Sequence, residues 1–169
     1  MKNTLLFFAS IAICFTAFAQ TGNTKLPPFQ RFPTLPPLQI LLSDSLTIYT
    51  KEQIPKDKSV LLMVFSPDCS HCQDETKDMI AHMDELNDVH IVMITMQPLS
   101  MMKDFIASYG LEKYSNIVIG KDIHYFTPGF FDIRNIPFMA LYNKKGKLIE
   151  GFGGNLPIST VIEILEDGN

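Results

Sequence analysis

Hydrophobic and polar residues follow one another along this chain in blocks that predict an α/β domain. A continuous apolar run at 60–65 and a mostly apolar segment at 89–96 predict strands that are buried on both faces of a sheet. Between them, residues 70–86 carry apolar side chains at spacings of three and four, which predicts an amphipathic helix. A strand, a helix and a second strand in this order form a βαβ unit, with parallel strands and a right-handed crossover.

The segments on either side of this unit predict the other elements of the domain. Short apolar runs separated by polar turn residues predict hairpins, and apolar positions at helical spacing predict helices. In chain order, these elements are a hairpin at 38–42 and 46–49, a helix at 100–109 stopped by Gly110, a short strand or extended segment at 116–119, a hairpin at 138–142 and 147–152, and a helix from about Pro157. Residues 126–132 contain Pro128 and Gly129, so the sequence leaves their state open.

The N-terminal part of the chain has a different character. Residues 1–19 combine an early lysine, a long apolar run and the ending Ala17-Phe18-Ala19, which predicts a cleaved secretory signal peptide and a periplasmic protein. An uncleaved membrane anchor is the alternative, although the apolar run is somewhat short for it. Residues 20–37 contain five prolines, which predict an extended lead-in along one edge of the domain. Residues 38–169 are then the predicted folded domain.

Composition and charge exclude several classes of partner. The 169 residues are 46% apolar and 19% charged, with a formal net charge of -4, which fits one globular domain. The basic residues are outnumbered by acidic ones and are not gathered into a stripe, so neither nucleic acid nor an acidic lipid surface is an expected partner. We therefore expect contact with a membrane only through a partner protein.

Removal of the signal peptide leaves Cys69 and Cys72 as the only cysteines, with two residues between them. A disulfide across so short a loop adds little stability, so chemistry is the better explanation for the pair. The pair lies where a buried strand meets the start of a helix, whose unpaired N–H groups favour a thiolate. Cys69, nearer the exposed end, is the predicted nucleophile, and Cys72 is the predicted resolving thiol of a disulfide exchange that needs no cofactor.

The sequence also bears on other uses of the cysteine pair. A zinc site lacks a second pair of ligands, and a c-type haem would need histidine in place of Gln73, so no resident metal is expected. A copper-binding chaperone would use Cys69, Cys72 and His124 as soft and imidazole ligands for Cu(I). A third alternative is a non-catalytic adaptor with a vestigial dithiol, suggested by the unusual residues Asp68 and Ser70-His71.

The residues around the pair resemble those of a known family. Residues 60–75 are similar to the active-site segment of thioredoxin-like proteins, and the mature chain resembles their exported TlpA/ResA branch. This resemblance implies an α/β thioredoxin fold, a mixed central sheet flanked by helices, with an N-terminal β-hairpin and a central insertion between Pro98 and Asn135. The segment Asn135-Ile136-Pro137-Phe138 resembles the loop that carries a cis-proline opposite the dithiol. By that likeness Pro137 is cis, and the backbone of Ile136 pairs with an extended partner chain.

The resemblance also assigns roles to residues near the cysteines. Glu75 matches a glutamate that ResA-like proteins keep beside the pair, and one helical turn after Cys72 it would accept the proton of that thiol. A solvated acid that interacts with the helix dipole is the alternative role. Met63 stands where thioredoxin has a buried aspartate, which leaves Glu75 as the only obvious proton shuttle. Ser70 and His71, between the cysteines, are predicted to contact the substrate.

The direction of electron flow is left open by the sequence. The overall resemblance favours a reductase of protein disulfides, with cytochrome c maturation as one process that it would serve, and such a reductase would need a membrane thiol donor for its own re-reduction. His71 favours the opposite direction, because a histidine between the cysteines is also found in disulfide-forming oxidases and stabilises the reduced form.

Overall fold

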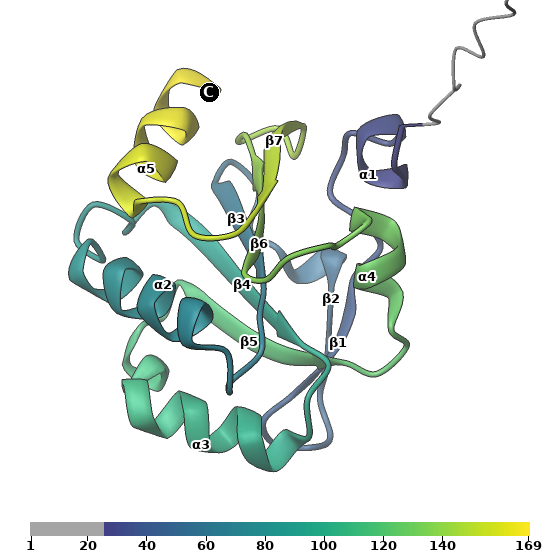
Figure 1. The fold of residues 1–169 in the computed structure, drawn as a ribbon. Helices are drawn as coiled ribbons and strands as arrows, with labels where there is room; N and C mark the ends of the chain where they lie inside the picture. Colours follow the sequence, from purple (N-terminus) through teal and green to yellow (C-terminus); the bar gives the residue numbers. More distant parts are fainter. Residues whose placement is uncertain (1–25) are drawn as a thin grey trace, which may run out of the picture.

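The computed structural model describes residues 26–169 and has a seven-stranded mixed sheet at its centre (Figure 1). The strands are β1 Gln39–Leu42, β2 Ile48–Thr50, β3 Ser59–Val64, β4 Val89–Thr95, β5 Ile117–Asp122, β6 Phe138–Tyr142 and β7 Leu148–Gly153. Their order across the sheet is β2-β1-β5-β4-β3-β6-β7. Strands β3, β4 and β5 are parallel, and the two predicted hairpins supply the antiparallel strands at the two edges.

Helices cover both faces of this sheet, as Figure 1 shows. Their bounds are α1 Pro28–Arg31, α2 Ser70–Ala81, α3 Leu99–Tyr109, α4 Phe126–Phe131 and α5 Ile158–Asp167, with short 3-10 turns at Lys51–Gln53 and Leu111–Lys113. Helices α2, α3 and α5 pack on one face, and α1 and α4 lie on the other. The predicted α/β architecture, a mixed sheet flanked by helices with an N-terminal hairpin and an insertion, is thereby confirmed.

The central strands divide their side chains between two hydrophobic cores. All six residues of β3 are buried, as its continuous apolar run predicts. Leu61 and Met63 point into the core beneath α2, α3 and α5, whereas Leu62 and Val64 point into the core on the other face. Alternation of this kind fixes the register of β3, because a shift by one residue would exchange the two sets. The end of β3, and the cysteines after it, are therefore held firmly in place.

The lead-in differs from the prediction of an extended segment. Residues Pro28–Arg31 form the helical turn α1, because a proline at the first helical position loses no hydrogen bond there. This turn buries Phe29, whose ring centroid lies 5.7 Å from that of Phe131 and 5.8 Å from that of Phe138. Beyond it, an isolated bridge between Thr34 and Lys147 attaches the lead-in beside the edge strand β7. The predicted signal peptide and residues 20–25 lie outside the described residues.

Several predicted bounds are corrected by the structure. Helix α2 ends at Ala81 and not at Leu86, and the turns that follow it still bury Met83 and Leu86. The segment 126–132, left open by the sequence, contains the short helix α4. Helix α3 ends at Gly110 as predicted, with that glycine in the left-handed conformation at φ 59°. Within residues 26–169, no helix combines the length and apolarity needed to cross a bilayer.

Candidate active site

The two cysteines lie at the N-terminus of α2, directly after the central strand β3. Cys69 is the N-cap of the helix, and its Sγ accepts a hydrogen bond from the Cys72 backbone N–H at 3.4 Å. An amide that would otherwise be unpaired in the first turn thus points at the sulfur, which stabilises negative charge on it. Both cysteines are free thiols, with Cys69 half-buried and Cys72 fully buried. Only Cys69 is open to attack on a partner molecule.

The environment of Cys72 disfavours its ionised form. Burial is the largest of the effects that raise the pKa of the Cys72 thiol to about 12, and the neighbouring Cys69 and Glu75 contribute to this rise by hydrogen bonding and repulsion. A hydrogen bond to the backbone at Ser66 acts in the opposite direction but is outweighed. Cys72 is therefore a protonated thiol near neutral pH, and it needs a proton acceptor before it can act as a nucleophile.

A cis peptide bond joins Ile136 to Pro137 in the loop before β6. Because Phe138 of β6 pairs with Val64 of β3, this loop reaches the end of the sheet where the cysteines lie. The Sγ of Cys69 is 3.9 Å from the carbonyl oxygen of Ile136. The structure thus brings Ile136 and Pro137 to the dithiol from a segment far away in the sequence.

Glu75 is buried one helical turn after Cys72, with 2% of its surface exposed. One carboxylate oxygen, Oε2, accepts hydrogen bonds from Asn155 Nδ2 at 3.0 Å and from the Leu156 backbone N–H at 3.2 Å. The other oxygen, Oε1, has no hydrogen-bond partner among the described residues. Burial raises the pKa of this carboxyl group, against the two hydrogen bonds. The alternative of a solvated surface acid is wrong.

Asn155 is a member of the site that the sequence did not reveal. Its Nδ2 donates to Oε2 of Glu75 and also, at 2.8 Å, to the backbone carbonyl of His71 between the cysteines. It directly follows Gly154, whose φ of +100° requires a glycine and turns the chain from β7 back toward α2. Gly153 and Gly154 before it indicate a turn in the sequence, but they do not indicate a contact between Asn155 and the distant carboxylate of Glu75. Ser70 and the side chain of His71 are exposed beside Cys69.

His124 is not brought to the cysteines. It follows β5, which is separated from β3 by β4, so it lies two strands away along the same end of the sheet. Its backbone N–H donates to Asp122, and its side chain is exposed. Among residues 26–169, no three His, Cys, Asp or Glu side chains are grouped as metal ligands. The copper site formed by Cys69, Cys72 and His124 is therefore wrong.

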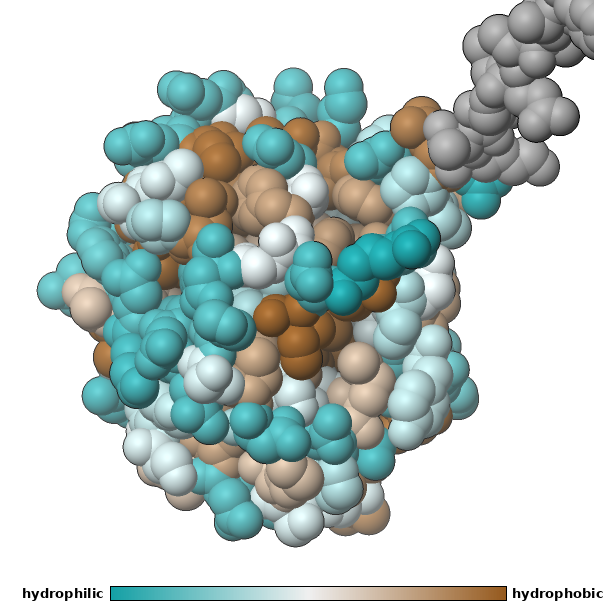
Figure 2. Space-filling model, viewed as in Figure 1, coloured by the Kyte–Doolittle hydropathy of each residue, from teal (hydrophilic) through white to brown (hydrophobic). Residues whose placement is uncertain are grey.

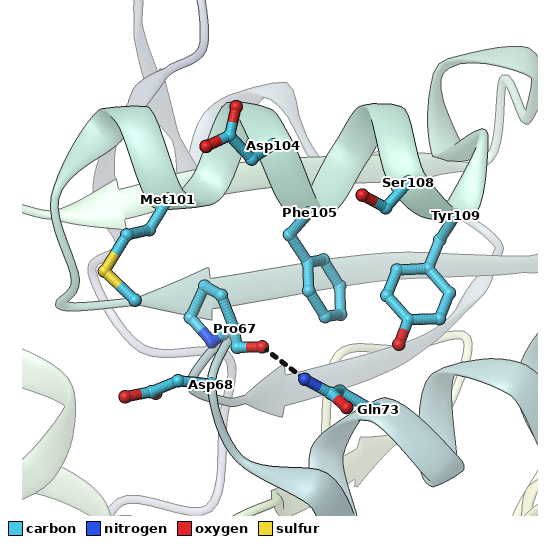
Figure 3. A pocket seen from close by; sticks show the side chains of 8 residues that line it. All are labelled: Pro67, Asp68, Gln73, Met101, Asp104, Phe105, Ser108 and Tyr109. Atoms are coloured by element: carbon cyan, nitrogen blue, oxygen red, sulfur yellow. Dashed lines mark hydrogen bonds between the residues drawn. The ribbon is translucent and has the colours of Figure 1, made fainter.

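A groove of about 500 Å³ runs beside the dithiol, between the start of α2 and helix α3 (Figure 3). Pro67, Asp68 and Gln73 form one wall, and the Gln73 side chain donates to the Pro67 carbonyl at 2.9 Å. The other wall comes from α3, with Phe105 and Tyr109 directed toward Gln73. The groove thus borders the loop that carries Cys69.

The face seen in Figure 2 carries an apolar patch beside the loop that joins α4 to β6. Hydrophilic side chains frame this patch, including those over α2. Ile133 and Ile136, both half-buried, belong to the same loop as the cis-proline. An apolar surface next to a reactive thiol is suited to a protein partner more than to a small polar molecule.

The fold and the dithiol define a thioredoxin-like thiol-disulfide oxidoreductase, with the CxxC pair at a helix N-terminus and a cis-proline opposite it. The family model of the AhpC/TSA family matches residues 34–168, and the chain belongs to that family. Among curated protein sequences, none matches this chain.

Solved structures share the fold at low sequence identity. StoA from Bacillus subtilis is 19% identical with a TM-score of 0.59, over 78% of this chain and 98% of its own. The exposed lipoprotein thioredoxin of Streptococcus pneumoniae is 20% identical with a TM-score of 0.61, over 78% and 99%. A secreted disulfide oxidoreductase of Mycobacterium tuberculosis, homologous to Escherichia coli DsbE, is 13% identical with a TM-score of 0.64, over 77% and 95%. At these identities the likeness concerns the fold.

Proposed function

We propose that this protein is an exported reductase of protein disulfides, of the TlpA/ResA type. The observation that carries the proposal is the asymmetry of the cysteine pair. Cys69 is half-buried at the helix N-terminus, beside the carbonyl of Ile136, while Cys72 is fully buried behind it. The Cys69 thiol can reach a partner molecule, whereas the Cys72 thiol can react only with the mixed disulfide that forms on Cys69.

The proposed reaction has two exchange steps. The Cys69 thiolate attacks one sulfur of a substrate disulfide, so a mixed disulfide forms and the other substrate sulfur leaves as a thiolate. Cys72 then loses its proton and attacks Sγ of Cys69, which releases the second substrate thiolate and leaves a Cys69–Cys72 disulfide. Two electrons pass from the protein to the substrate, and the two substrate thiolates take up protons.

The residues around the pair take the following parts in this proposal. Glu75, buried beside Cys72 and with its pKa raised, accepts the proton that Cys72 must lose. Pro137 and the backbone of Ile136 hold an extended substrate segment against Cys69, in the place where the Ile136 carbonyl lies 3.9 Å from Sγ. Ser70 and His71, exposed beside Cys69, contact the same segment.

Export and the reductive direction rest on different observations. Residues 1–19 have the pattern of a secretory signal, and structures that share the fold include a secreted and a surface-exposed protein. In the periplasm the oxidised pair would be restored by a membrane thiol donor, because no thiol buffer is available there. The Cys–Cys disulfide of an apocytochrome awaiting haem attachment is one substrate class of this kind.

Three measurements test the proposal. The Cys69→Ser variant should lose disulfide reduction entirely, whereas Cys72→Ser should accumulate a mixed disulfide with its substrate, visible on a non-reducing gel. Reduction of insulin by Cys69→Ser at the wild-type rate would refute a role for the pair. The reduction potential then decides direction, because a value near -270 mV, about that of thioredoxin, supports a reductase and a value of about -120 mV an oxidase.

A further inference from the structure

The groove beside Cys69 has the form of a docking site for the segment that flanks a substrate disulfide. Its volume of about 500 Å³ accommodates several side chains of an extended peptide, and it borders the loop of Cys69 (Figure 3). Phe105 is buried and Tyr109 half-buried on the α3 wall, so aromatic surface lines part of the groove (Figure 3). Asp68, which lines the groove, directly precedes Cys69 in the chain.

The charged residues that line the groove, Asp68 and Asp104, are both acidic. Asp68 lies on the cysteine wall and Asp104 on the α3 wall, and both side chains are exposed (Figure 3). Within residues 26–169, no basic group forms an ion pair with either carboxylate. Asp68 accepts a hydrogen bond from the Ser66 hydroxyl, which leaves its negative charge in place. Lys77, the basic residue near Tyr109, is already paired with Asp74 at 2.9 Å.

We propose that this groove selects substrates whose disulfide is flanked by lysine or arginine together with an apolar or aromatic side chain. The cation would be attracted by the exposed carboxylates of Asp68 and Asp104 on the two rims of the groove, and the apolar group would pack on Phe105 and Tyr109. This inference rests on the proposed disulfide exchange, for which it names the substrate class. Rim charges of this kind act mainly on the association rate and are screened by salt.

The experiment uses two synthetic peptides, each with one intramolecular disulfide and one phenylalanine, flanked by either three lysines or three glutamates. Pre-reduced protein is mixed with each peptide in a single turnover, so the protein dithiol is oxidised as the peptide disulfide is reduced. At low salt the lysine peptide should react about tenfold faster than the glutamate peptide, and 0.5 M salt should remove most of the difference.

Asp104→Lys tests the groove directly, because Asp104 belongs to α3 and takes no part in the exchange steps. This variant should lose the preference for the lysine peptide while keeping the wild-type rate toward bis(2-hydroxyethyl) disulfide, which is small and uncharged. Glu163→Lys makes the same charge change on the exposed surface of α5 and should keep the preference. Equal rates with both peptides, or an unchanged preference in Asp104→Lys, would overturn the docking proposal alone. Failure to reduce any of the disulfides would instead overturn the proposed function.

Discussion

The carboxyl group of Glu75 combines near-complete burial with one unpartnered oxygen, which is a costly arrangement for a charge. Because its pKa is raised in the folded protein, the fold favours the protonated form. The stabilising contribution of the group is therefore complete below its unfolded pKa, about 4.3, and is lost as the pH rises through the folded value. At neutral pH the raised pKa of Glu75 therefore lowers the free energy of unfolding.

Replacing the ionisable carboxyl group of Glu75 should stabilise the protein but remove the proposed acceptor for the Cys72 proton. Glu75→Gln should raise the free energy of unfolding at pH 7 by about 1 kcal/mol or more, and should change it little below pH 4. Urea denaturation at the two pH values measures this difference. Asp74→Asn is the matched control, because Asp74 is an exposed neighbour paired with Lys77, and it should leave the stability nearly unchanged. Equal stability of Glu75→Gln and wild type at pH 7 would contradict the argument.

Asn155 should set the pH at which Glu75 ionises. Its hydrogen bond lowers the pKa of Glu75 against the effect of burial, so Asn155→Leu should raise that pKa further. If Glu75 accepts the proton of Cys72, the rate of mixed-disulfide release in this variant shifts to higher pH by about one unit or less. Stopped-flow pH profiles of wild type and Asn155→Leu measure the shift. In a Glu75→Gln background the Asn155 change should leave the profile unmoved, and a shift there would assign the effect to the structure of the loop.

Whether a site residue could be predicted from the sequence depends on how far along the chain its contacts lie. The positions of Cys69 and Cys72 follow from a strand running into a helix, because both capping and burial are local consequences of that junction. Asn155 lies eighty residues from Glu75, and only the packing of the β7–α5 connection against α2 brings the two together. No spacing rule connects such residues. Pro137 was found through a family resemblance and not through any property of the surrounding residues.

Among the elements, α5 shows how one helix supports another next to the site. Its N-cap is Pro157, which has no side-chain acceptor, and the first N–H groups of the helix therefore need a partner from elsewhere. Oδ2 of Asp78, from α2, accepts the N–H of Ile158 at 2.9 Å. This contact holds the connection that carries Asn155 against the helix that carries Cys72.

Removing this acceptor should loosen α5 more than α2. Asp78→Ala should lower the free energy of unfolding by about 1 kcal/mol, and Asp78→Asn, which keeps an acceptor oxygen, should lower it by less. Amide hydrogen exchange measures the local effect, with loss of protection expected in the first turn of α5. Asp78 also pairs with His82 at 3.2 Å, so His82→Gln is the control for that second contact. If the exchange protection of α5 is the same in Asp78→Ala as in wild type, the hydrogen bond from Ile158 to Asp78 does not stabilise the start of α5.

The elements that were predicted correctly have strong patterns, and the others are short. Strands β3 and β4 follow from short, mostly apolar segments, and α3 and α5 follow from regular helical spacing and clear end signals. Helices α1 and α4 have four and six residues and contain prolines, and they are stabilised by the packing of Phe29 and Phe131 on each other. Tertiary contacts of this kind override local propensity and leave no periodic signal.

Over the whole molecule, strand order is the feature that the sequence determines least directly. The βαβ unit fixes β3 beside β4, but the pairing of β1 with β5 joins Ile40 to Asp122, and no local pattern specifies it. The resemblance to thioredoxin-like proteins implied a mixed sheet with an N-terminal hairpin, but it did not specify this pairing. The resulting order places the dithiol at the carboxyl ends of the parallel strands, where side chains from separate loops converge.

One buried hydrogen bond joins the edge of this sheet to its centre. The hydroxyl of Tyr49 on β2 lies 2.8 Å from Nε2 of His90 on β4, and both side chains are buried in the core beneath α1 and α4. Burial lowers the pKa of His90, and the charge of Lys58 lowers it further. The fold therefore favours neutral imidazole, whereas the unfolded chain takes up a proton once the pH falls below about 6.5.

Stability should consequently decline as the pH falls from 6.5 toward the lower pKa of folded His90. The free energy of unfolding can fall by as much as about 1.4 kcal/mol per pH unit in this range. The range distinguishes this loss from the loss due to surface carboxylates, which occurs at lower pH. Guanidinium denaturation at pH 7.5 and 5.5 should show this loss in wild type and a much smaller one in His90→Gln, which can still bond to Tyr49. His124→Gln, an exposed histidine, should behave as wild type. A wild-type protein as stable at pH 5.5 as at 7.5 would mean that His90 opens to solvent and takes up its proton without unfolding the rest of the sheet.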